Sequence, residues 1–317
     1  MSKHPFSLAW QHAYKIPAPI YRTLFSCAAD LTWLLRKGGV TQLEKNLQRV
    51  APQLTAKQVR KLARQGMRSY MRYFSEVFVL THLTPEQVRH RVRLEGEVPV
   101  LAAINEGKSP ILALTHQGNW DLAGVFASAH IAPVLTVAER LKPDEVYQEF
   151  LKFRAELGMT ILTAGDSGVF RQLLRAAKGP SHLICLLADR DLSASGIEVN
   201  FFGHTARVAA GPAALAVASD APLFPVGVTY EKITGKRRKQ AGASWGIVLK
   251  FYPPVDIDRT QTKEEQINAT TQKWVTALEE SIAQHPEDWH MLQKVFIEDL
   301  DPERYARITK EAHDGAA

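Results

Sequence analysis

The stretch "ILALTHQGNWD", residues 111–121, places two residue types that can move protons close together in sequence. The imidazole of His116 could remove a proton from a hydroxyl, and the carboxylate of Asp121 could fix its tautomer and stabilise the imidazolium. Residues five apart point about 140° away from each other on a helix and to opposite faces of a strand. Only a bend lets the two side chains converge, and Gly118 can supply one. The structural alternative is that Asn119 or Asp121 merely caps a helix.

Charged side chains gather in a second stretch, "LLADRDLSASGIEVNFFGHTARVAAGPAALA", residues 186–216. Charge that follows a buried strand is costly unless it is paired or used. Glu198 is a second carboxylate that could partner His116, and the arginines could bind phosphates or a carbonyl oxygen. Local ion pairing within a loop is the alternative. The candidate substrate-binding residues are Arg190, Arg207, Asp189 and Arg140.

The sequence lacks the motifs of several other kinds of catalytic and binding site. Neither Cys-x-x-Cys nor His-Glu-x-x-His occurs, so no metal site is expected. A phosphate-binding glycine loop followed by Lys-Ser/Thr is also missing. "GDSG" at 165–168 resembles a serine protease nucleophile, but that scaffold is a β-barrel. Val169 excludes the nucleophile elbow of α/β hydrolases as well.

Apolar runs alternate with helical patterns from residue 91 onward. This alternation predicts an α/β fold, with a twisted, mostly parallel central sheet of about seven strands flanked by helices. In such sheets ligands sit at the carboxyl ends of the strands, which is where His116 falls. The predicted strands are 91–95, 111–116, 133–139, 160–164, 182–189, 223–230 and 245–252, and the predicted helices between and after them are 121–130, 143–157, 166–177, 211–219 and 263–284.

A helical N-terminal extension is expected to precede the sheet. Residues 18–37 form an amphipathic pattern that either packs on the core or lies in a membrane interface, with Trp33 at the water boundary. No linker is visible, so residues 1–317 are expected to form a single domain. Its parts are a helical segment 18–90, with the membrane-facing helix, and an α/β catalytic core 91–295.

Two basic segments suggest an anionic partner. Residues 57–78 place Arg60, Arg64, Arg68 and Arg72 on one helical stripe without acidic partners at i+4. The basic run 231–240 could rest on an anionic membrane. The alternatives are a solvated helix face and a solvated hairpin loop.

Charge and composition indicate which class of partner the protein binds and in which cellular compartment it lies. Lys and Arg outnumber Asp and Glu by 39 to 33, and the pI of about 9.2 favours anionic partners. Nucleic acid is not expected, because aromatic residues do not interleave with the basic run. Two cysteines, Cys27 and Cys185, favour a reducing compartment. Without a signal peptide or a run long enough to span a bilayer, we expect a peripheral protein on the cytoplasmic face of the cell membrane.

Four successive blocks carry a family resemblance: "THQGNWD", "LICLLADRD", "GIEVNFFG" and "APLFPVGV". Together they resemble the motif blocks of glycerolipid-type acyltransferases, and most closely the lipid A late acyltransferase superfamily. The resemblance includes the Arg-rich helix and "HPEDWHML", and it spans about residues 15–295. "ADRDLSASGIEVNFFG" and "HPEDWHMLQ" look more like the phosphatidylinositol mannoside acyltransferases of that superfamily.

The resemblance implies transfer of a fatty acyl group, preferably palmitoyl, from acyl-CoA to a mannose hydroxyl of a phosphatidylinositol mannoside. His116 matches the catalytic histidine and Asp121 the motif aspartate, and Glu198 falls where the family keeps a glutamate near the active site. The side chain of Asp121 can instead cap N–H groups at the start of a helix, so we expect Glu198 to orient the imidazole. Backbone N–H groups near Gly118 or Arg190 would stabilise the thioester oxygen.

Neither a bound cofactor nor a covalent acyl-enzyme is expected, since acyl-CoA acts as a co-substrate. Two alternatives stay open. One is an acyltransferase for lipid A or another glycolipid. The other is a non-catalytic protein that binds lipid at the membrane surface.

Overall fold

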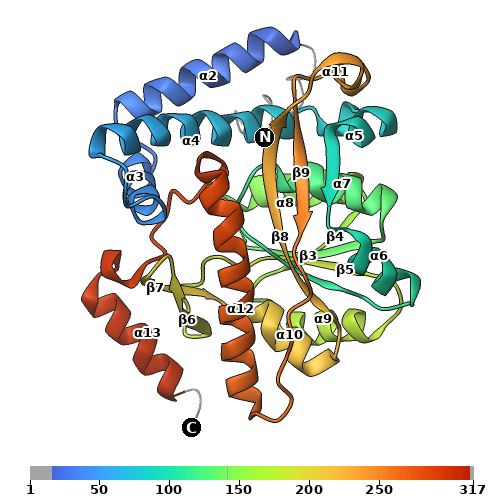
Figure 1. The fold of residues 1–317 in the computed structure, drawn as a ribbon, viewed down its shortest axis with the longest axis vertical. Helices are drawn as coiled ribbons and strands as arrows, with labels where there is room; N and C mark the ends of the chain where they lie inside the picture. Colours follow the sequence, from blue (N-terminus) through green and yellow to red (C-terminus); the bar gives the residue numbers. More distant parts are fainter. Residues whose placement is uncertain (1–15, 141, 315–317) are drawn as a thin grey trace.

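A seven-stranded sheet forms the centre of the computed structural model, which describes residues 16–140 and 142–314 (Figure 1). Its strand order is β1–β9–β8–β2–β5–β3–β4. Five neighbouring strands, from β8 to β4, run parallel, whereas β9 runs antiparallel to β8 and carries β1 parallel to itself. The predicted mostly parallel sheet is confirmed. The strands are β1 Val92–Glu95, β2 Ile111–Leu114, β3 Val134–Ala138, β4 Met159–Thr163, β5 Leu183–Leu187, β8 Leu223–Lys232 and β9 Trp245–Phe251.

Helices cover both faces of this sheet and extend beyond it. The predicted flanking helices are confirmed, and shorter helices that the sequence pattern did not reveal accompany them. The helices are α2 Ala18–Leu34, α3 Val40–Val50, α4 Ala56–Val77, α5 Pro85–Arg91, α6 Val98–Asn105, α7 Trp120–His130, α8 Asp144–Glu156, α9 Val169–Lys178, α10 Gly211–Ser219, α11 Gly235–Ala241, α12 Lys263–Gln284 and α13 Pro302–Asp314.

The side chains of β2 alternate between the two faces of the sheet and so contribute to two hydrophobic cores. Ile111 and Ala113 pack with residues of α9, α10 and α12 on one face. Leu112 and Leu114 pack with residues of α4, α5, α6, α7 and α8 on the other face. Because side chains alternate between faces along a strand, an all-apolar strand such as "ILAL" fits only between two layers of helices. Full burial of Ile111, at 0% exposure, stabilises the fold by roughly 1.5–3 kcal/mol.

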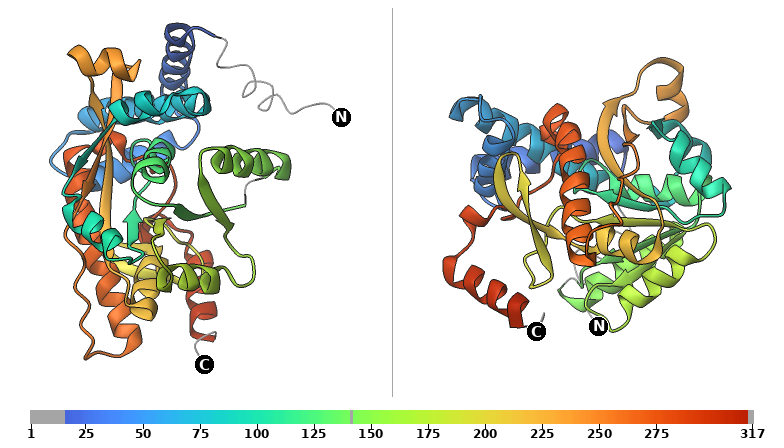
Figure 2. Two further views of the ribbon diagram at one scale, coloured as in Figure 1. Left: turned by 90° about the vertical axis from the view of Figure 1, so that its right-hand side faces the viewer. Right: turned by 60° about the horizontal axis from the view of Figure 1, so that its bottom comes forward.

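The charged stretch after β5 folds as a hairpin instead of a loop. Strands β6 (Gly196–Phe201) and β7 (His204–Ala209) form a separate antiparallel pair, which lies beside α12 (Figure 1, Figure 2). Its two-residue turn, Phe202 and Gly203, has positive φ at both positions, as type I′ hairpins require. The basic run 231–240 likewise differs from the expected loop, because it ends β8 and forms α11.

The arginine stripe of α4 has its anionic partners inside the chain. Arg64 and Arg68 each donate two hydrogen bonds to the carboxylate of Asp30 on α2, at 2.6–2.9 Å. Arg60 lies 3.4 Å from Glu44 of α3. The inference that an external anion lies against this stripe is therefore wrong for these three arginines. They hold α2 and α3 on α4, which the two helices contact side by side (Figure 1).

One face of α2 packs inward and the other is left apolar and exposed. Tyr21 and Ala29 are buried, and Trp33 donates its indole N–H to the carbonyl of Arg60 at 2.9 Å, so Trp33 does not mark a water boundary. The exposed side chains are Ile20, Leu24, Leu31, Leu34 and Leu35, which are 53–61% exposed. Among the described residues, no helix combines the length and apolar character needed to cross a bilayer.

We predict that Asp30→Ala destabilises the protein by about 1 kcal/mol at neutral pH, because two partly exposed guanidinium groups lose their shared carboxylate. Arg64 and Arg68 hold the pKa of that carboxyl well below its usual range. A depressed folded-state pKa gives stability that is present above the unfolded pKa, near 4, and is lost progressively below it. Urea unfolding at pH 7 and pH 2 measures this difference.

The matched control is Asp256→Ala, which removes an exposed carboxylate. It should leave the unfolding midpoint unchanged. Equal effects of the two substitutions at pH 7 would show that the bonds of Asp30 to Arg64 and Arg68 contribute nothing to the free energy of unfolding.

Candidate active site

Two neighbouring parallel strands bring His116 and Asp189 together. In the register of β2 and β5, Leu114 lies opposite Leu187. The chain continues two residues beyond each strand, so both side chains emerge at the same carboxyl edge of the sheet. Nδ1 of His116 lies 2.6 Å from Oδ1 of Asp189, and the backbone N–H of His116 donates to Oδ2 at 3.0 Å.

The electrostatics of this pair prepare the imidazole as a base. Asp189 is 1% exposed, and its Oδ2 also accepts the indole N–H of Trp289 at 2.9 Å. Burial raises the pKa of Asp189, but the charge and hydrogen bonds of His116 lower it, and the net shift is downward. Burial lowers the pKa of His116, Asp189 raises it, and the net shift is upward. An ionised carboxylate only accepts hydrogen bonds, so Nδ1 carries the proton and Nε2 is the basic nitrogen.

The predicted bend after His116 is present. Gly118 has φ +56°, and a Cβ at this position would meet the carbonyl oxygen of Val228 at 2.6 Å, so only glycine fits. Asn119 then caps α7 by accepting the N–H of Leu122 at 2.9 Å. The bend therefore leads the chain into α7, and it does not bring the side chain of Asp121 to His116.

Asp121 is a buried structural anchor. Arg154 of α8 donates to both of its oxygens, at 2.7 and 3.3 Å, and the hydroxyl of Tyr73 donates to Oδ2 at 2.7 Å. These bonds tie α7 to α8 and α4. The hypothesis that Asp121 orients the imidazole is wrong, because Asp189 holds that nitrogen.

Glu198 is also misassigned. It lies opposite Arg207 in the β6–β7 hairpin and accepts a hydrogen bond from that side chain at 3.0 Å. The hydroxyl of Tyr305 donates to the same oxygen at 2.6 Å. Opposite charges facing across an antiparallel pair satisfy each other, so the prediction that Glu198 orients His116 is wrong.

A cavity of about 480 Å³ opens beside His116, and its lining is partly polar and partly aromatic. Its lining includes His116, Trp120, Glu139, Arg190, His290 and Met291. A smaller pocket of about 70 Å³ adjoins it under α7 and shares Trp120, Val137, Arg154 and Leu187 with it. Aliphatic side chains such as Leu112, Leu114, Val134 and Met159 form most of the small pocket. Together the two spaces offer a polar end next to the base and an apolar end inside the core.

The four candidate substrate-binding residues separate in space. Arg190 lines the cavity, and its Nε donates to the carbonyl of Lys294 at 3.1 Å. Asp189 serves His116 instead of a substrate. Arg207 lines a different surface hollow, shared with Glu198. Arg140 lies outside the lining of the 480 Å³ cavity and pairs with Asp144 and Asp166 on the surface.

A second histidine of the cavity differs electrostatically from His116. His290 is 7% exposed, and burial lowers its pKa to about 3. Its Nε2 lies 3.0 Å from Oγ of Ser69, and that hydroxyl donates to Oδ1 of Asp288 at 2.6 Å. His290 therefore stays neutral and tied to the scaffold, whereas His116 has the raised pKa that a base needs.

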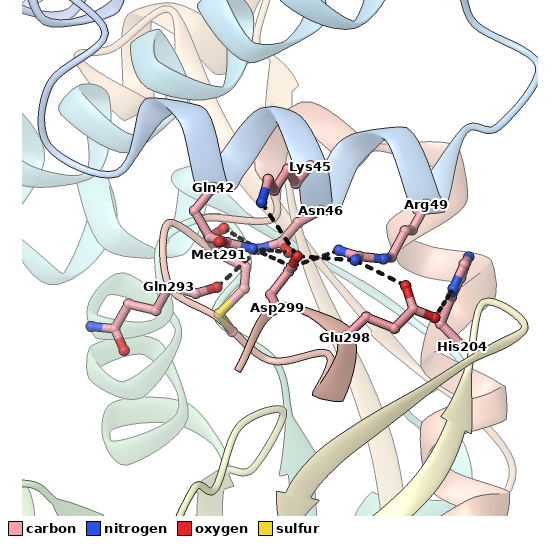
Figure 3. Close-up of polar contacts among 9 residues, drawn as sticks. All are labelled: Gln42, Lys45, Asn46, Arg49, His204, Met291, Gln293, Glu298 and Asp299. Carbon is pink, nitrogen blue, oxygen red and sulfur yellow. Dashed lines mark hydrogen bonds and ion pairs between the residues drawn. The ribbon is translucent and has the colours of Figure 1, made fainter. Parts of the chain in front are cut away.

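The C-terminal side of the cavity is held by α3, a contribution that the sequence pattern did not reveal. Figure 3 shows Asn46 of α3 donating to the carbonyls of Met291 and Gln293, at 2.8 and 3.0 Å. Asp299 accepts hydrogen bonds from Gln42 and Arg49 on the same helix, both at 2.7 Å (Figure 3). These bonds seat the segment 291–299, whose first residues line the cavity.

Among the described residues, His285, Glu287 and Asp288 bring potential metal-ligand atoms within 4.8 Å of one another. Both oxygens of Asp288 already accept hydrogen bonds, from Ser69 and from the backbone of Tyr230. The carboxylate of Asp288 therefore already joins α4 to β8.

We predict that Asp189→Asn lowers the pKa of His116 below its wild-type value. The carboxylate charge is what raises this pKa, and burial alone lowers it. NMR titration of the imidazole Cε1–H, assigned with a His116→Ala sample, measures the shift. Glu198→Gln is the control and should leave the titration unchanged, because Glu198 is bonded to Arg207 and Tyr305. A wild-type titration in Asp189→Asn contradicts the assignment.

Comparison with known proteins identifies the family of this chain. A phosphatidylinositol mannoside acyltransferase from Mycolicibacterium smegmatis is 35% identical over 305 residues, covering 96% of this chain and 94% of that protein. The protein of the same name from Mycobacterium tuberculosis is 34% identical over 307 residues, covering 96% and 91%. Among solved structures, a 1-acyl-sn-glycerophosphate acyltransferase from Thermotoga maritima covers 84% of this chain and 97% of its own, with 15% identity and a TM-score of 0.35. The model of the bacterial lipid A biosynthesis acyltransferase family matches residues 7–297, and this chain belongs to that family.

Proposed function

We propose that this protein transfers a fatty acyl group from acyl-CoA to a mannose hydroxyl of a phosphatidylinositol mannoside, with His116 as the general base. The observation that carries the proposal is the His116–Asp189 pair at a cavity with one polar and one apolar end. The two mycobacterial relatives, named for this acceptor and similar over 96% of the chain, support the choice of substrate.

The reaction follows from the tautomer of His116. Nε2 takes the proton of the acceptor hydroxyl while that oxygen attacks the thioester carbonyl carbon. Asp189 stabilises the imidazolium that forms, because its carboxylate already holds Nδ1–H. The C–S bond then breaks, the thiolate takes the proton from the imidazolium, and the acylated sugar and free thiol leave. No covalent acyl-enzyme is needed.

Negative charge on the thioester oxygen needs a stabilising partner. The backbone N–H groups expected for this role are engaged elsewhere: that of Gln117 donates to Thr115 and that of Gly118 to Asp288. Arg190 is the cation that lines the cavity without a role in fixing α7, in contrast to Arg154. We assign the stabilisation of the oxyanion to Arg190.

The apolar pocket under α7 is the proposed seat of the end of the acyl chain, and the adjoining cavity would hold the rest of it. Its aliphatic lining lies in the core between α7 and the sheet, where burial of each methylene of the chain gains about 0.8 kcal/mol. Palmitoyl-CoA is the proposed donor, and a series of acyl-CoA chain lengths tests this preference.

A membrane contact at α2 would give the cavity access to a lipid acceptor. The exposed leucines of α2 supply apolar area, and α11 places Lys236, Arg238 and Lys239 on the surface at the same end of the molecule (Figure 1, Figure 2). An apolar helix face beside basic side chains suits the interface of an anionic bilayer. We propose peripheral attachment to the cytoplasmic face of the cell membrane through this end.

We predict that His116→Ala lowers the transfer rate roughly 10²–10⁴-fold, the usual contribution of a general base. Mass spectrometry of products from palmitoyl-CoA and phosphatidylinositol mannoside measures the rate, and a thermal melt verifies folding. His182→Ala, a surface histidine that bonds the nearby carbonyl of Pro180, is the matched control and should keep full activity.

The same assay discriminates between the proposed functions. More than about a tenth of the wild-type rate in His116→Ala is a loss under about 1.4 kcal/mol, too small for a general base. Acylation of lipid A precursors in place of the mannoside would favour the alternative acceptor. Lipid binding without turnover on any acceptor would favour a non-catalytic protein.

We predict that Leu24→Ser combined with Leu31→Ser lowers partitioning onto anionic vesicles about tenfold, because two leucines that are 59% and 56% exposed no longer enter the interface. Vesicle flotation measures binding. The control is Val98→Ser with Phe170→Ser, which removes exposed apolar groups from α6 and α9 instead.

Changing Lys236, Arg238 and Lys239 to alanine tests the electrostatic contribution to membrane binding. Binding to anionic vesicles should weaken while binding to neutral vesicles stays the same. If neither the α2 nor the α11 variant changes flotation, this end of the molecule is not the membrane contact.

A further inference from the structure

We propose that Trp289 is a positioning residue for the acyl transfer: its indole N–H fixes the carboxylate of Asp189 so that Oδ1 faces the imidazole of His116. The proposal rests on the proposed role of His116 as the base. It adds a third member to the His116–Asp189 pair.

The backbone places Trp289 against the catalytic loop. Trp289 forms an isolated antiparallel bridge with Gln117. On either side of this bridge, the N–H of Gly118 donates to the carbonyl of Asp288 at 3.0 Å, and the N–H of His290 donates to the carbonyl of His116 at 2.7 Å. The segment 288–290 is thus a short strap across the loop that carries the base.

The side chain of Trp289 completes the carboxylate's hydrogen bonds. Trp289 is 0% exposed, and its buried indole N–H has an acceptor in Oδ2 of Asp189. Oδ2 of Asp189 accepts both this N–H and the backbone N–H of His116, which leaves Oδ1 for the imidazole. Without the indole, one of the two donors that hold Oδ2 is lost and the carboxylate gains rotational freedom.

The strap is anchored well enough to act as a fixed support. Asp288 accepts from Ser69 of α4 at 2.6 Å and from the backbone of Tyr230 at 2.7 Å. Directly after the strap, Asn46 of α3 holds the carbonyl of Met291 at 2.8 Å (Figure 3). Bonds from two helices and one strand therefore determine where the indole N–H lies.

The chain offers a matched control for removing one indole N–H. Trp274 of α12 is as deeply buried, at 1% exposure, but its Nε1 has no hydrogen-bond partner among the described residues. Trp274→Phe and Trp289→Phe therefore remove the same group from the core, and only the second breaks a bond to Asp189.

We expect Trp289→Phe to lower kcat about tenfold, because misplacing a catalytic group by a fraction of an ångström is costly, while the KM values change less than about twofold.

The indole bond also lowers the pKa of Asp189. Its loss makes the carboxylate more basic, which stabilises the imidazolium, so the acidic limb of the pH–rate profile moves to higher pH. Trp274→Phe should change neither kcat nor the profile. The proposal is overturned if both variants behave alike or if the limb of Trp289→Phe does not move.

A measurement on the unmodified tryptophan keeps the test decisive if Trp289→Phe fails to fold. In protein labelled with ¹⁵N-indole tryptophan, the indole N–H signal of Trp289 should follow the titration of His116 and stop doing so in Asp189→Asn. A Trp120→Phe sample identifies the signal of Trp120, the other indole beside His116, whose ring centroid lies 5.6 Å from that of the imidazole. If no signal other than that of Trp120 follows the titration, the proposal is refuted. Because this readout needs no substrate, absence of acyl transfer with a normal titration would refute the proposed function alone.

Discussion

An ionised carboxylate buried at the edge of a sheet needs hydrogen-bond donors, and Asp189 obtains them from two distant parts of the chain. Moving an unpaired carboxylate out of water costs several kcal/mol. The backbone and imidazole of His116 supply two donors and the indole of Trp289 a third. The sheet order, the bend at Gly118 and the strap 288–290 all have to be in place for these donors to converge.

Helix α4 connects this buried site to the exposed N-terminal helices. Its arginine stripe holds α2 through Asp30, while side chains on its other face reach the site. Tyr73 holds Asp121, and Glu76 accepts hydrogen bonds from Asn119 and from Tyr230. Burial raises the pKa of Glu76, and the hydrogen bonds from Asn119 and Tyr230 offset part of this shift. A displacement of α4 would therefore reach both α2 and the loop that carries His116.

Sequence patterns predicted the seven strands and the main helices because each carries its own periodicity. The bend at Gly118 was predictable for the same local reason. The orienting carboxylate was not, although Asp189 follows β5 by the same two residues that separate His116 from β2. Which strands are neighbours depends on how the connecting helices cross the sheet, and no local pattern encodes that order.

The two misassigned carboxylates show the same limitation. Asp121 and Glu198 are chemically suitable, but tertiary contacts with Arg154 and Arg207 engage them. The arginine stripe of α4 gave no signal of its partners, because Asp30 and Glu44 lie on other helices. Pairing that depends on packing between elements becomes visible only in the folded chain.

The position of the strap has a consequence for the order in which the protein matures. A chain is synthesised from its N-terminus, and all seven strands are complete once β9 ends at Phe251. At that stage α3 has been made and the sheet can already place His116 beside Asp189, but residues 288–299, which α3 will hold, do not yet exist. A chain interrupted before Asp288 would have the imidazole and the carboxylate without the indole that completes their support. A segment that is made after the whole sheet thus completes the support of His116 and Asp189, so a chain that stops before Asp288 lacks this part of the site.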